Sequence, residues 1–170
     1  MHRFFWIVGA ILWVVSCNEN LIYSEYASLK NGVWKKGDTI HFQFKSMDTL
    51  ANHHIFLNIR NDERYEFSNL FLFLEMESPV GNIEVDTLEY EMALPTGEWL
   101  GKGMWSVKEN KLWYKESMRF RDSGVYQIKL LHAMRKNGEV EGLKNLVGIT
   151  DVGIQIEKAD SDGKKIDSKE

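Results

Sequence analysis

The sequence predicts an all-β protein, an antiparallel β-sandwich of the immunoglobulin-like or Greek-key type. Six short runs alternate apolar and polar residues, which is the period of a half-buried strand. Turn-forming pairs such as Asn31-Gly32 and Asn137-Gly138 separate the runs, and proline is rare. No stretch sustains a helical period of about 3.6 residues. Short strands divided by frequent turns are typical of antiparallel sandwiches.

The first element is a short apolar segment that resembles the signal peptide of bacterial lipoproteins. The apolar run from Phe4 to Val15 follows a basic start. It is shorter than the roughly 20 residues of a membrane-spanning helix and fits the core of a secretory signal. The run ends in Val-Val-Ser-Cys17, which resembles a lipobox. This resemblance implies that residues 1–16 are removed and that Cys17, the lone cysteine, carries the lipid.

Three further segments follow from composition. Residues 17–32 are expected to form the anchor and a tether, part of which docks because Leu21, Ile22 and Tyr26 are too apolar for a pure linker. The sandwich domain is expected over residues 33–157. Residues 158–170 are highly charged and contain a single branched apolar side chain, so we expect a disordered tail.

The alternating runs define the expected strands. In the first run Ile40, Phe42 and Phe44 share one face. In the third run Phe71 and Phe73 make the second face apolar as well, which indicates either burial on both sides or a contact surface. The six strands are predicted at residues 38–45, 54–60, 69–77, 83–92, 125–134 and 147–157.

Two of these runs are irregular. The alternation in 83–92 slips near Asp86-Thr87, which predicts a β-bulge. The last run is interrupted by Gly148 and Gly153.

A short motif precedes the fifth run. Asp122-Ser-Gly124-Val-Tyr126 has the form of a tyrosine corner, in which a tyrosine hydroxyl bonds to backbone upstream of its strand. Tyr126 is therefore assigned a structural role.

Length and charge limit the function classes. A chain of 170 residues is enough for one domain. The net charge of -4, from 21 basic and 25 acidic residues spread along the chain, argues against nucleic-acid binding, which requires a basic face. With one cysteine, no intrachain disulfide is possible.

The sequence offers no recognisable active site. His53 and His54 are adjacent, so a strand would place them on opposite faces, away from a shared metal. The pairs Glu75/Glu77 and Glu89/Glu91 are read as solvated edges and not as acid–base pairs. We therefore predict a non-enzymatic protein with no catalytic residues, no metal site and no cofactor.

Tryptophan and glycine concentrate in one loop. Residues 95–105 carry Trp99 and Trp105 among three glycines, and Trp113 follows. An exposed tryptophan can be a contact anchor or a platform for a sugar ring. We favour the alternative, in which at least one of Trp99 and Trp105 folds back to close an end of the sandwich. Residues 58–72 form a second candidate, either a capped loop or a recognition loop.

Several separated motifs together resemble the gliding-motility lipoprotein family GldH of Bacteroidota. The resemblance covers nearly all of the mature chain to about residue 157. It implies an outer-membrane lipoprotein that is needed for gliding and is associated with type IX secretion, with no known enzyme activity. The motifs are the lipobox, Arg60-Asn61, Tyr65-x-Phe67-Ser68-Asn69-Leu70, Asp86-Thr87, Gly97-x-Trp99-Leu100-Gly101-x-Gly103, Met134-Arg135 and Gly148-Ile149-x-Asp151-Val152-Gly153.

Two functions from different classes follow. The first is a lipid-anchored accessory subunit of an envelope motility or secretion machinery, whose partners would be other envelope proteins. The second is a glycan-binding surface lipoprotein that uses its tryptophans as a sugar platform. The face of the outer membrane on which the protein lies stays open. The candidate partner-binding residues are Arg60, Asn61, Tyr65, Phe67, Ser68, Asn69, Trp99 and Trp105.

Overall fold

The computed structural model describes residues 20–103 and 105–159, and within them the regular structure is almost entirely strand. One short 3-10 helix, η1 (Lys30–Gly32), follows the first strand. The strands are β1 (Leu21–Ser28), β2 (Val33–Lys35), β3 (Ile40–Ser46), β4 (Asn52–Asp62), β5 (Asn69–Glu77), β6 (Ile83–Glu91), β7 (Val107–Arg119), β8 (Gly124–His132), β9 (Asn145–Val147) and β10 (Ile149–Lys158).

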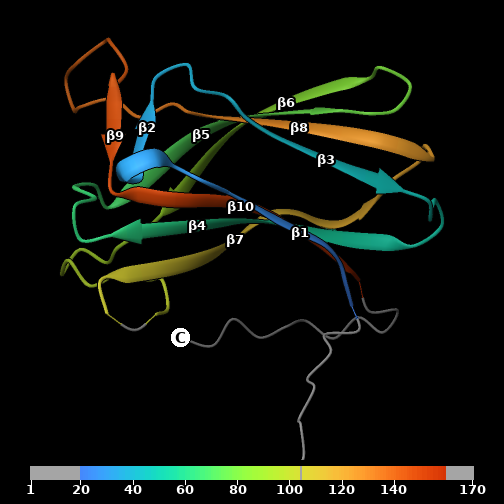
Figure 1. The fold of residues 1–170 in the computed structure, drawn as a ribbon, viewed down its shortest axis with the longest axis horizontal. Helices are drawn as coiled ribbons and strands as arrows, with labels where there is room; N and C mark the ends of the chain where they lie inside the picture. Colours follow the sequence, from blue (N-terminus) through green and yellow to red (C-terminus); the bar gives the residue numbers. More distant parts are fainter. Residues whose placement is uncertain (1–19, 104, 160–170) are drawn as a thin grey trace, which may run out of the picture.

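Two four-stranded antiparallel sheets face each other (Figure 1). Sheet A has the order β1-β10-β4-β7, and sheet C has the order β3-β8-β5-β6. The small ribbon β2–β9 lies at one end, beside η1 (Figure 1). In sheet A the first strand of the described chain pairs with the last one, with Tyr26 opposite Gly153. The predicted all-β antiparallel fold is confirmed.

The core lies between the sheets and follows from strict alternation along the strands. In β4 the inward residues Ile55, Leu57 and Ile59 are fully buried. Residues opposite one another in neighbouring strands share a face, so each apolar stripe extends across its sheet. Sheet A contributes Ile55, Leu57, Ile59, Val152, Ile154 and Ile156, and sheet C contributes Ile40, Phe42, Phe44, Leu70, Leu72, Leu74, Met76, Ile128 and Leu130.

The bulge predicted at Asp86-Thr87 is wrong. The β5–β6 register runs without a shift, with Leu74 opposite Asp86 and Phe73 opposite Thr87. The alternation in the sequence is broken because β6 is an edge strand with exposed Val85 on its outer face. On its other face Asp86 accepts a hydrogen bond from Tyr114 of β7 at 2.9 Å, so a polar residue occupies an inward position.

Gly148 and Gly153 have different roles. Gly148, with φ of 93°, separates β9 from β10 in the left-handed region that favours glycine. Gly153 lies inside β10 and pairs regularly with Asn58 of β4. The expected interruption therefore occurs at one glycine only.

The tyrosine corner forms as the motif predicts. The Asp122 N–H donates to the Tyr126 hydroxyl at 3.2 Å. The Tyr126 ring is buried and stacks on Phe44 with 5.4 Å between ring centroids. Phe120 packs against both rings.

β7 was not among the predicted strands. It pairs with β4 along its length, from Val107 opposite Asp62 to Arg119 opposite Asn52. Alternation is weak here because the strand is at the edge of sheet A, and its inward positions include the polar Asn110 beside Leu112.

The segments predicted to flank the sandwich are described only in part. The expected tether contains β1 and η1, and the Leu29 N–H donates to the Thr150 carbonyl at 2.8 Å. The predicted signal peptide, Cys17 and all but the start of the predicted tail lie outside the described residues. Among the residues that the structure describes, no helix has the length and apolarity to cross a membrane.

Candidate functional site

Many interacting polar and aromatic side chains lie on the outer face of sheet A. Strand pairing arranges this face in rows, since residues opposite one another point to the same side. One row holds Arg60 and Glu109, the next holds Asn58 and Lys111, and the third holds Phe56 and Trp113. We call this surface the sheet A face. Its members are Tyr26, His54, Phe56, Asn58, Arg60, Glu109, Lys111, Trp113, Gln155 and Glu157.

One end of the face is an ion pair held under an aromatic ring. The Tyr26 hydroxyl donates to Glu109 Oε1 at 2.5 Å, and Arg60 Nη2 lies 3.3 Å from the same oxygen. The Arg60 guanidinium carbon is 4.3 Å from the centroid of the Tyr26 ring, a cation–π contact. Burial and the hydrogen bond to the Glu109 carboxylate raise the pKa of Tyr26 to about 12, so the phenol remains protonated.

Gly153 makes this arrangement possible. A Cβ atom at position 153 would lie 2.7 Å from Cδ1 of Tyr26, which is too close for contact. The ring of Tyr26 therefore occupies the space that a side chain on β10 would fill, and it reaches across that strand toward Arg60 of β4.

The centre of the face is a linked set of amides and charges. The Asn58 Nδ2 group donates to Gln155 Oε1 at 2.9 Å, and Gln155 Nε2 donates to Glu157 Oε1 at 2.6 Å. Lys111 Nζ donates to the same Glu157 oxygen at 2.7 Å. Asn58 is only 1% exposed, and its Oδ1 atom has no hydrogen-bond partner among the described residues. A buried amide oxygen without a donor is an unmet acceptor.

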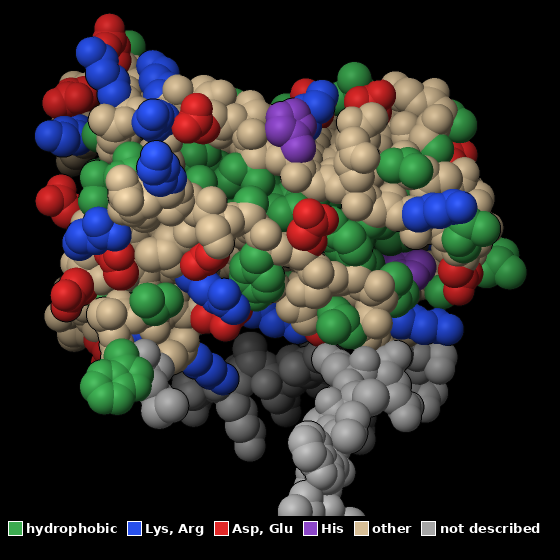
Figure 2. All heavy atoms as spheres, in the orientation of Figure 1, with side chains coloured by type: hydrophobic (Ala, Val, Ile, Leu, Met, Phe, Trp, Pro, Cys, Tyr) green, Lys and Arg blue, Asp and Glu red, His purple; other side chains and the backbone are tan. Residues whose placement is uncertain are grey.

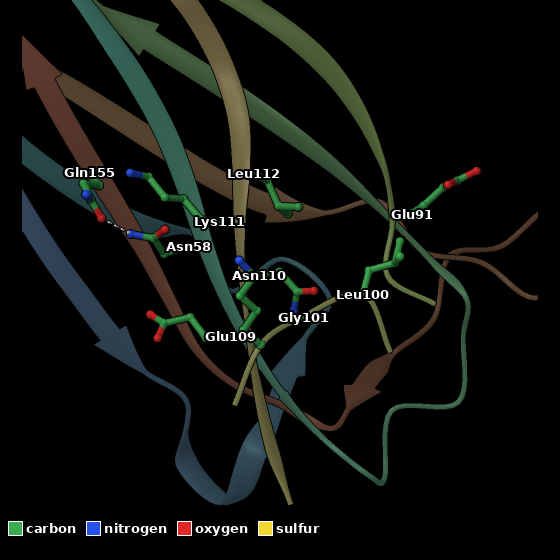
Figure 3. Close-up of a pocket in the computed structure, with 10 residues that line it drawn as sticks. Asn58, Glu91, Leu100, Gly101, Glu109, Asn110, Lys111, Leu112 and Gln155 are labelled. Atoms are coloured by element: carbon green, nitrogen blue, oxygen red, sulfur yellow. Dashed lines mark hydrogen bonds between the residues drawn. The ribbon is translucent and has the colours of Figure 1, made fainter. Parts of the chain in front are cut away.

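A hollow of about 640 Å³ adjoins this centre (Figure 3). Asn58, Gln155 and Lys111 lie on one side of β7, and Leu100 and Gly101 lie on the other (Figure 3). The hollow therefore wraps around the edge strand of sheet A and stays open to solvent, unlike the enclosed cleft that catalysis usually needs.

The third part of the face is aromatic. Phe56 points outward yet is buried, because Trp113 covers it at 4.3 Å between ring centroids and Lys111 Nζ lies 4.0 Å from its ring. His54 contacts the edge of Trp113 at 5.0 Å. The indole itself is 44% exposed. An exposed tryptophan beside charged and amide groups is the composition of a recognition surface.

Arg60 and Asn61, two of the sequence candidates, lie on opposite faces of β4. Arg60 belongs to the sheet A face, whereas Asn61 is fully buried on the inner side. Asn61 Oδ1 accepts a hydrogen bond from Asn110 Nδ2 at 2.9 Å, and its own Nδ2 has no partner among the described residues. Gly101 packs directly on Asn110, since a Cβ there would be 2.7 Å from Asn110 Oδ1. Asn61 therefore holds the 100–102 loop against the sheet.

Tyr65, Phe67 and Trp99 close one end of the sandwich. Tyr65 is buried and donates its hydroxyl to the Asn69 carbonyl at 2.7 Å, and burial raises its pKa. Its ring lies 5.7 Å from Phe67 and 6.2 Å from Trp99, both half-buried. The expectation that at least one loop tryptophan folds back is met by Trp99.

The remaining candidates divide between turn chemistry and open surface. The Ser68 carbonyl accepts the N–H groups of Met92 and Ala93, and Asn69 Nδ2 donates to Glu89 at 3.0 Å. Trp105 is 91% exposed. The structure thus brings Tyr65, Phe67, Asn69 and Trp99 together as an end cap, and leaves Arg60 and Trp105 apart from it.

A second apolar surface lies on the outer face of sheet C. Phe73 is exposed, while Phe71 is half-buried and its N–H donates to Met134 Sδ at 3.2 Å. With Arg135 and Val140 these rings line a hollow of about 410 Å³ under the β8–β9 connection. Phe73 is therefore the exposed outward residue of β5, whose other outward residues are half-buried.

Most members of the sheet A face were missed from sequence. Glu109, Lys111 and Trp113 belong to β7, the strand whose alternation was too weak to predict. Tyr26 and Gln155 join only through the pairing of β1 with β10. The one available signal was Trp113 next to charged residues at positions two apart. No group of three metal-binding side chains occurs among residues 20–103 and 105–159.

Fold and surface together define a class: an antiparallel β-sandwich with an open face of polar and aromatic side chains on sheet A. A family model described as GldH lipoprotein matches residues 21–156, and the chain belongs to that family. The protein called gliding motility lipoprotein GldH homolog in Christiangramia forsetii is 45% identical over 157 residues, covering 92% of this chain and 96% of the relative. Gliding motility lipoprotein GldH of Flavobacterium johnsoniae is 39% identical over 154 residues, covering 91% and 94%.

Solved structures show only distant likeness. The VP2 subviral particle of infectious bursal disease virus aligns with a TM-score of 0.35 at 12% identity, over 79% of this chain and 30% of that one. Dimeric latent PorU from Porphyromonas gingivalis aligns with a TM-score of 0.33 at 11% identity, over 84% of this chain and 14% of that one. Scores at this level do not establish a shared fold.

Proposed function

We propose that this protein is a non-enzymatic, lipid-anchored accessory subunit of the gliding-motility and type IX secretion machinery of the outer membrane. The observation that carries the proposal is membership of the GldH lipoprotein family, with relatives of nearly equal length that are named for gliding motility. The lipobox-like sequence ending in Cys17 supplies the attachment point. Two or three acyl chains hold a protein on a membrane far more firmly than one.

The sheet A face is the surface through which the subunit contacts its partner. It combines the half-exposed Trp113 with the charged pairs Arg60–Glu109 and Lys111–Glu157. Aromatic and arginine side chains are enriched in protein interfaces, where a partly exposed tryptophan serves as an anchor.

The test is mild crosslinking of the native lipoprotein in solubilised outer membrane, followed by its purification and identification of attached proteins. The wild-type protein should recover envelope motility or secretion components, and Cys17→Ala should not. Trp113→Ala should reduce recovery while the lipid remains. Trp105→Ala is the matched control, since that ring is exposed but lies outside the sheet A face. Recovery of the wild-type protein alone would contradict the proposal.

Glycan binding is a second candidate, and the exposure of Trp113 favours it. A sugar site needs an exposed ring with polar side chains beside it, and Lys111 lies next to Trp113 along β7, on the same face. Binding of the wild-type protein to envelope polysaccharides, lost in Trp113→Ala and kept in Trp105→Ala, would support this candidate. The absence of polysaccharide binding together with recovery of envelope proteins would support the first.

A further inference from the structure

We propose that one end of the sandwich, formed by the β3–β4 turn beside the start of β1, rests in the headgroup region of the phospholipid bilayer. The inference depends on lipidation of Cys17, which is part of the proposed function. It adds an orientation: the sandwich stands on this end, and the sheet A face is left free for a partner. We call this end the membrane end, defined by Leu21, Met47, Asp48, Leu50 and Arg119.

The anchor lies close to this end because the chain between them is short. Four residue steps separate Cys17 from Leu21, the first residue of β1. A fully extended chain spans about 3.3–3.6 Å per residue, so the lipid-bearing residue lies within roughly 14 Å of β1. A tether of this length holds the start of β1 near the membrane surface.

Backbone hydrogen bonds connect the start of β1 to the β3–β4 turn. The Lys158 N–H donates to the Asn20 carbonyl at 2.7 Å, and the Ala159 N–H donates to the Asn52 carbonyl at 2.8 Å. Asn52 is the first residue of β4 and directly follows the turn at residues 47–51. The turn and the anchor point are thus fixed at the same end of the molecule.

The turn presents apolar side chains to the outside. Leu50 is 78% exposed and Met47 is 68% exposed, and Leu21 and Ile22 are exposed nearby. Hydrophobic side chains are visible at the right-hand end of the molecule in Figure 2, where Figure 1 places the β3–β4 turn. Exposed apolar residues that cluster at one site mark an interaction surface more often than scattered ones do.

The turn is held in shape by its own hydrogen bonds. Asp48 Oδ1 accepts the N–H groups of Leu50 and Ala51, both at 2.9 Å. Arg119 Nε donates to the Thr49 carbonyl at 2.7 Å. A fixed turn loses little conformational entropy when its apolar side chains enter an interface.

Two basic side chains lie beside the apolar tip. Arg119 of β7 contacts the turn, and Lys158 lies beside Asn20. Asp48 is the acidic group in the turn, and its carboxylate is turned back onto the backbone. An apolar tip with arginine and lysine beside it matches the apolar and phosphate layers of a phospholipid surface.

The sheet A face remains accessible in this orientation. The strands of sheet A run away from the membrane end, and β4 alone spans Asn52–Asp62. At about 3.3 Å per residue, its far end lies roughly 35 Å away. Arg60 and its partner Glu109 lie near that far end.

The experiment measures how deeply a label on one added thiol lies in the bilayer. Lipidation consumes the Cys17 thiol, so Leu50→Cys in the lipidated full chain carries a single free thiol for an environment-sensitive fluorophore. The labelled protein is reconstituted into vesicles of phosphatidylethanolamine and phosphatidylglycerol that contain a headgroup-region nitroxide lipid. Ser106→Cys, at the opposite end beside Val107, and Ser24→Cys, in the row of Gln155 on the sheet A face, are matched labels.

The emission of the label at position 50 should shift to the blue and be quenched by the nitroxide lipid. The emission of labels at positions 106 and 24 should stay the same as for the protein in water. A label at 50 that stays in water in vesicle-bound, acylated protein overturns the orientation and leaves lipidation intact. Quenching at position 24 instead means that sheet A lies flat on the bilayer, which also overturns it. If the mass of the protein shows no acyl groups and the protein does not co-float with vesicles, Cys17 is not lipidated. The proposed orientation is then wrong as well.

Discussion

Gly148 lies at a crowded junction of backbone segments. Its φ is 93°, and a Cβ atom there would lie 2.3 Å from the Tyr65 backbone nitrogen. Its own N–H donates to the Gly32 carbonyl, and its carbonyl accepts the Asp62 N–H, each at 2.8 Å. This glycine therefore joins η1, the end of β4 and the β9–β10 junction at one point.

Replacing this glycine should destabilise the fold severely. Gly148→Ala combines a disfavoured φ with a clash against backbone that cannot move alone, so we expect a loss of at least about 3 kcal/mol in the free energy of unfolding. Urea denaturation of the unlipidated mature domain measures it. Gly138→Ala is the matched control, because Gly138 has a φ of 83° with nothing within 4 Å of its Cβ position. That control should lose about 1–2 kcal/mol, and equal losses would contradict the clash.

The tyrosine corner offers a second test at a single atom. Tyr126→Phe removes the oxygen that accepts the Asp122 N–H and leaves the ring packed on Phe44 and Phe120. We expect a loss of about 1 kcal/mol in the free energy of unfolding, the usual value of one hydrogen bond. Thermal unfolding of the two proteins side by side measures the difference. An unchanged melting temperature would mean that water replaces the hydroxyl at no cost.

At the scale of elements, the pairing of β1 with β10 organises the sheet A face. Tyr26 reaches Arg60 and Glu109 only because β10 carries glycine where the ring crosses it. The first described strand and the sheet A face are thus parts of one structure.

Gly153→Ala should act through Tyr26. The new methyl group would displace the ring, break the hydrogen bond to Glu109, and cost about 1–2 kcal/mol in the free energy of unfolding. In Tyr26→Ala protein the same glycine substitution should cost much less, because the ring is already absent. A double-mutant cycle measured by urea denaturation gives this coupling. Additive effects would show that Gly153 acts on the Glu25 backbone, which lies 3.0 Å from the same Cβ position.

Elements with a clear alternation were predictable, and those defined by pairing were not. β3 is predictable from the alternation of Ile40, Phe42 and Phe44, since each of these apolar residues points inward. β7 has inward Asn110 and outward Trp113, which reverses the usual pattern. Its outward Trp113 is explained only by Phe56, which points outward from the neighbouring strand and needs a cover.

The candidate site was predicted in the same uneven way. Each of the motifs around Tyr65 and Trp99 lies within one short stretch of sequence, and the two rings pack together at the sandwich end. Arg60 alone among the candidates lies on the sheet A face. The partners of Arg60 are 34 residues upstream, at Tyr26, and 49 residues downstream, at Glu109, a spacing that no local pattern reveals.

For the whole molecule, two buried histidines connect stability to pH. Burial lowers the pKa of His53 and His132, with Asp48 near the first and Lys36 near the second. Both rings therefore bind protons less readily in the folded protein than in the unfolded chain, where their ordinary pKa is about 6.5. The unfolded state binds more protons below that pH, so the folded protein loses stability as pH falls through it.

The free energy of unfolding should fall by up to about 1.4 kcal/mol per pH unit for each histidine below pH of about 6.5. Urea denaturation between neutral and mildly acidic pH measures the slope. His132→Leu, which removes one of the two rings, should show about half of it. The pKa values of Asp62 and Asp86 are lowered, so these carboxyl groups change the stability only at more acidic pH and not between neutral and mildly acidic pH. A free energy of unfolding that does not change with pH in the wild-type protein would contradict the role given to the two histidines.

The antiparallel pairing of the first and last described strands also determines how the molecule withstands tension. A pull on the N-terminus, directed along β1 away from the sandwich, is resisted by the hydrogen bonds from Leu21–Ser28 to β10 together, in shear. Bonds sheared together resist force far better than bonds unzipped one at a time. The rate of forced unfolding, and not the equilibrium stability, then decides how long the sandwich survives under such a pull.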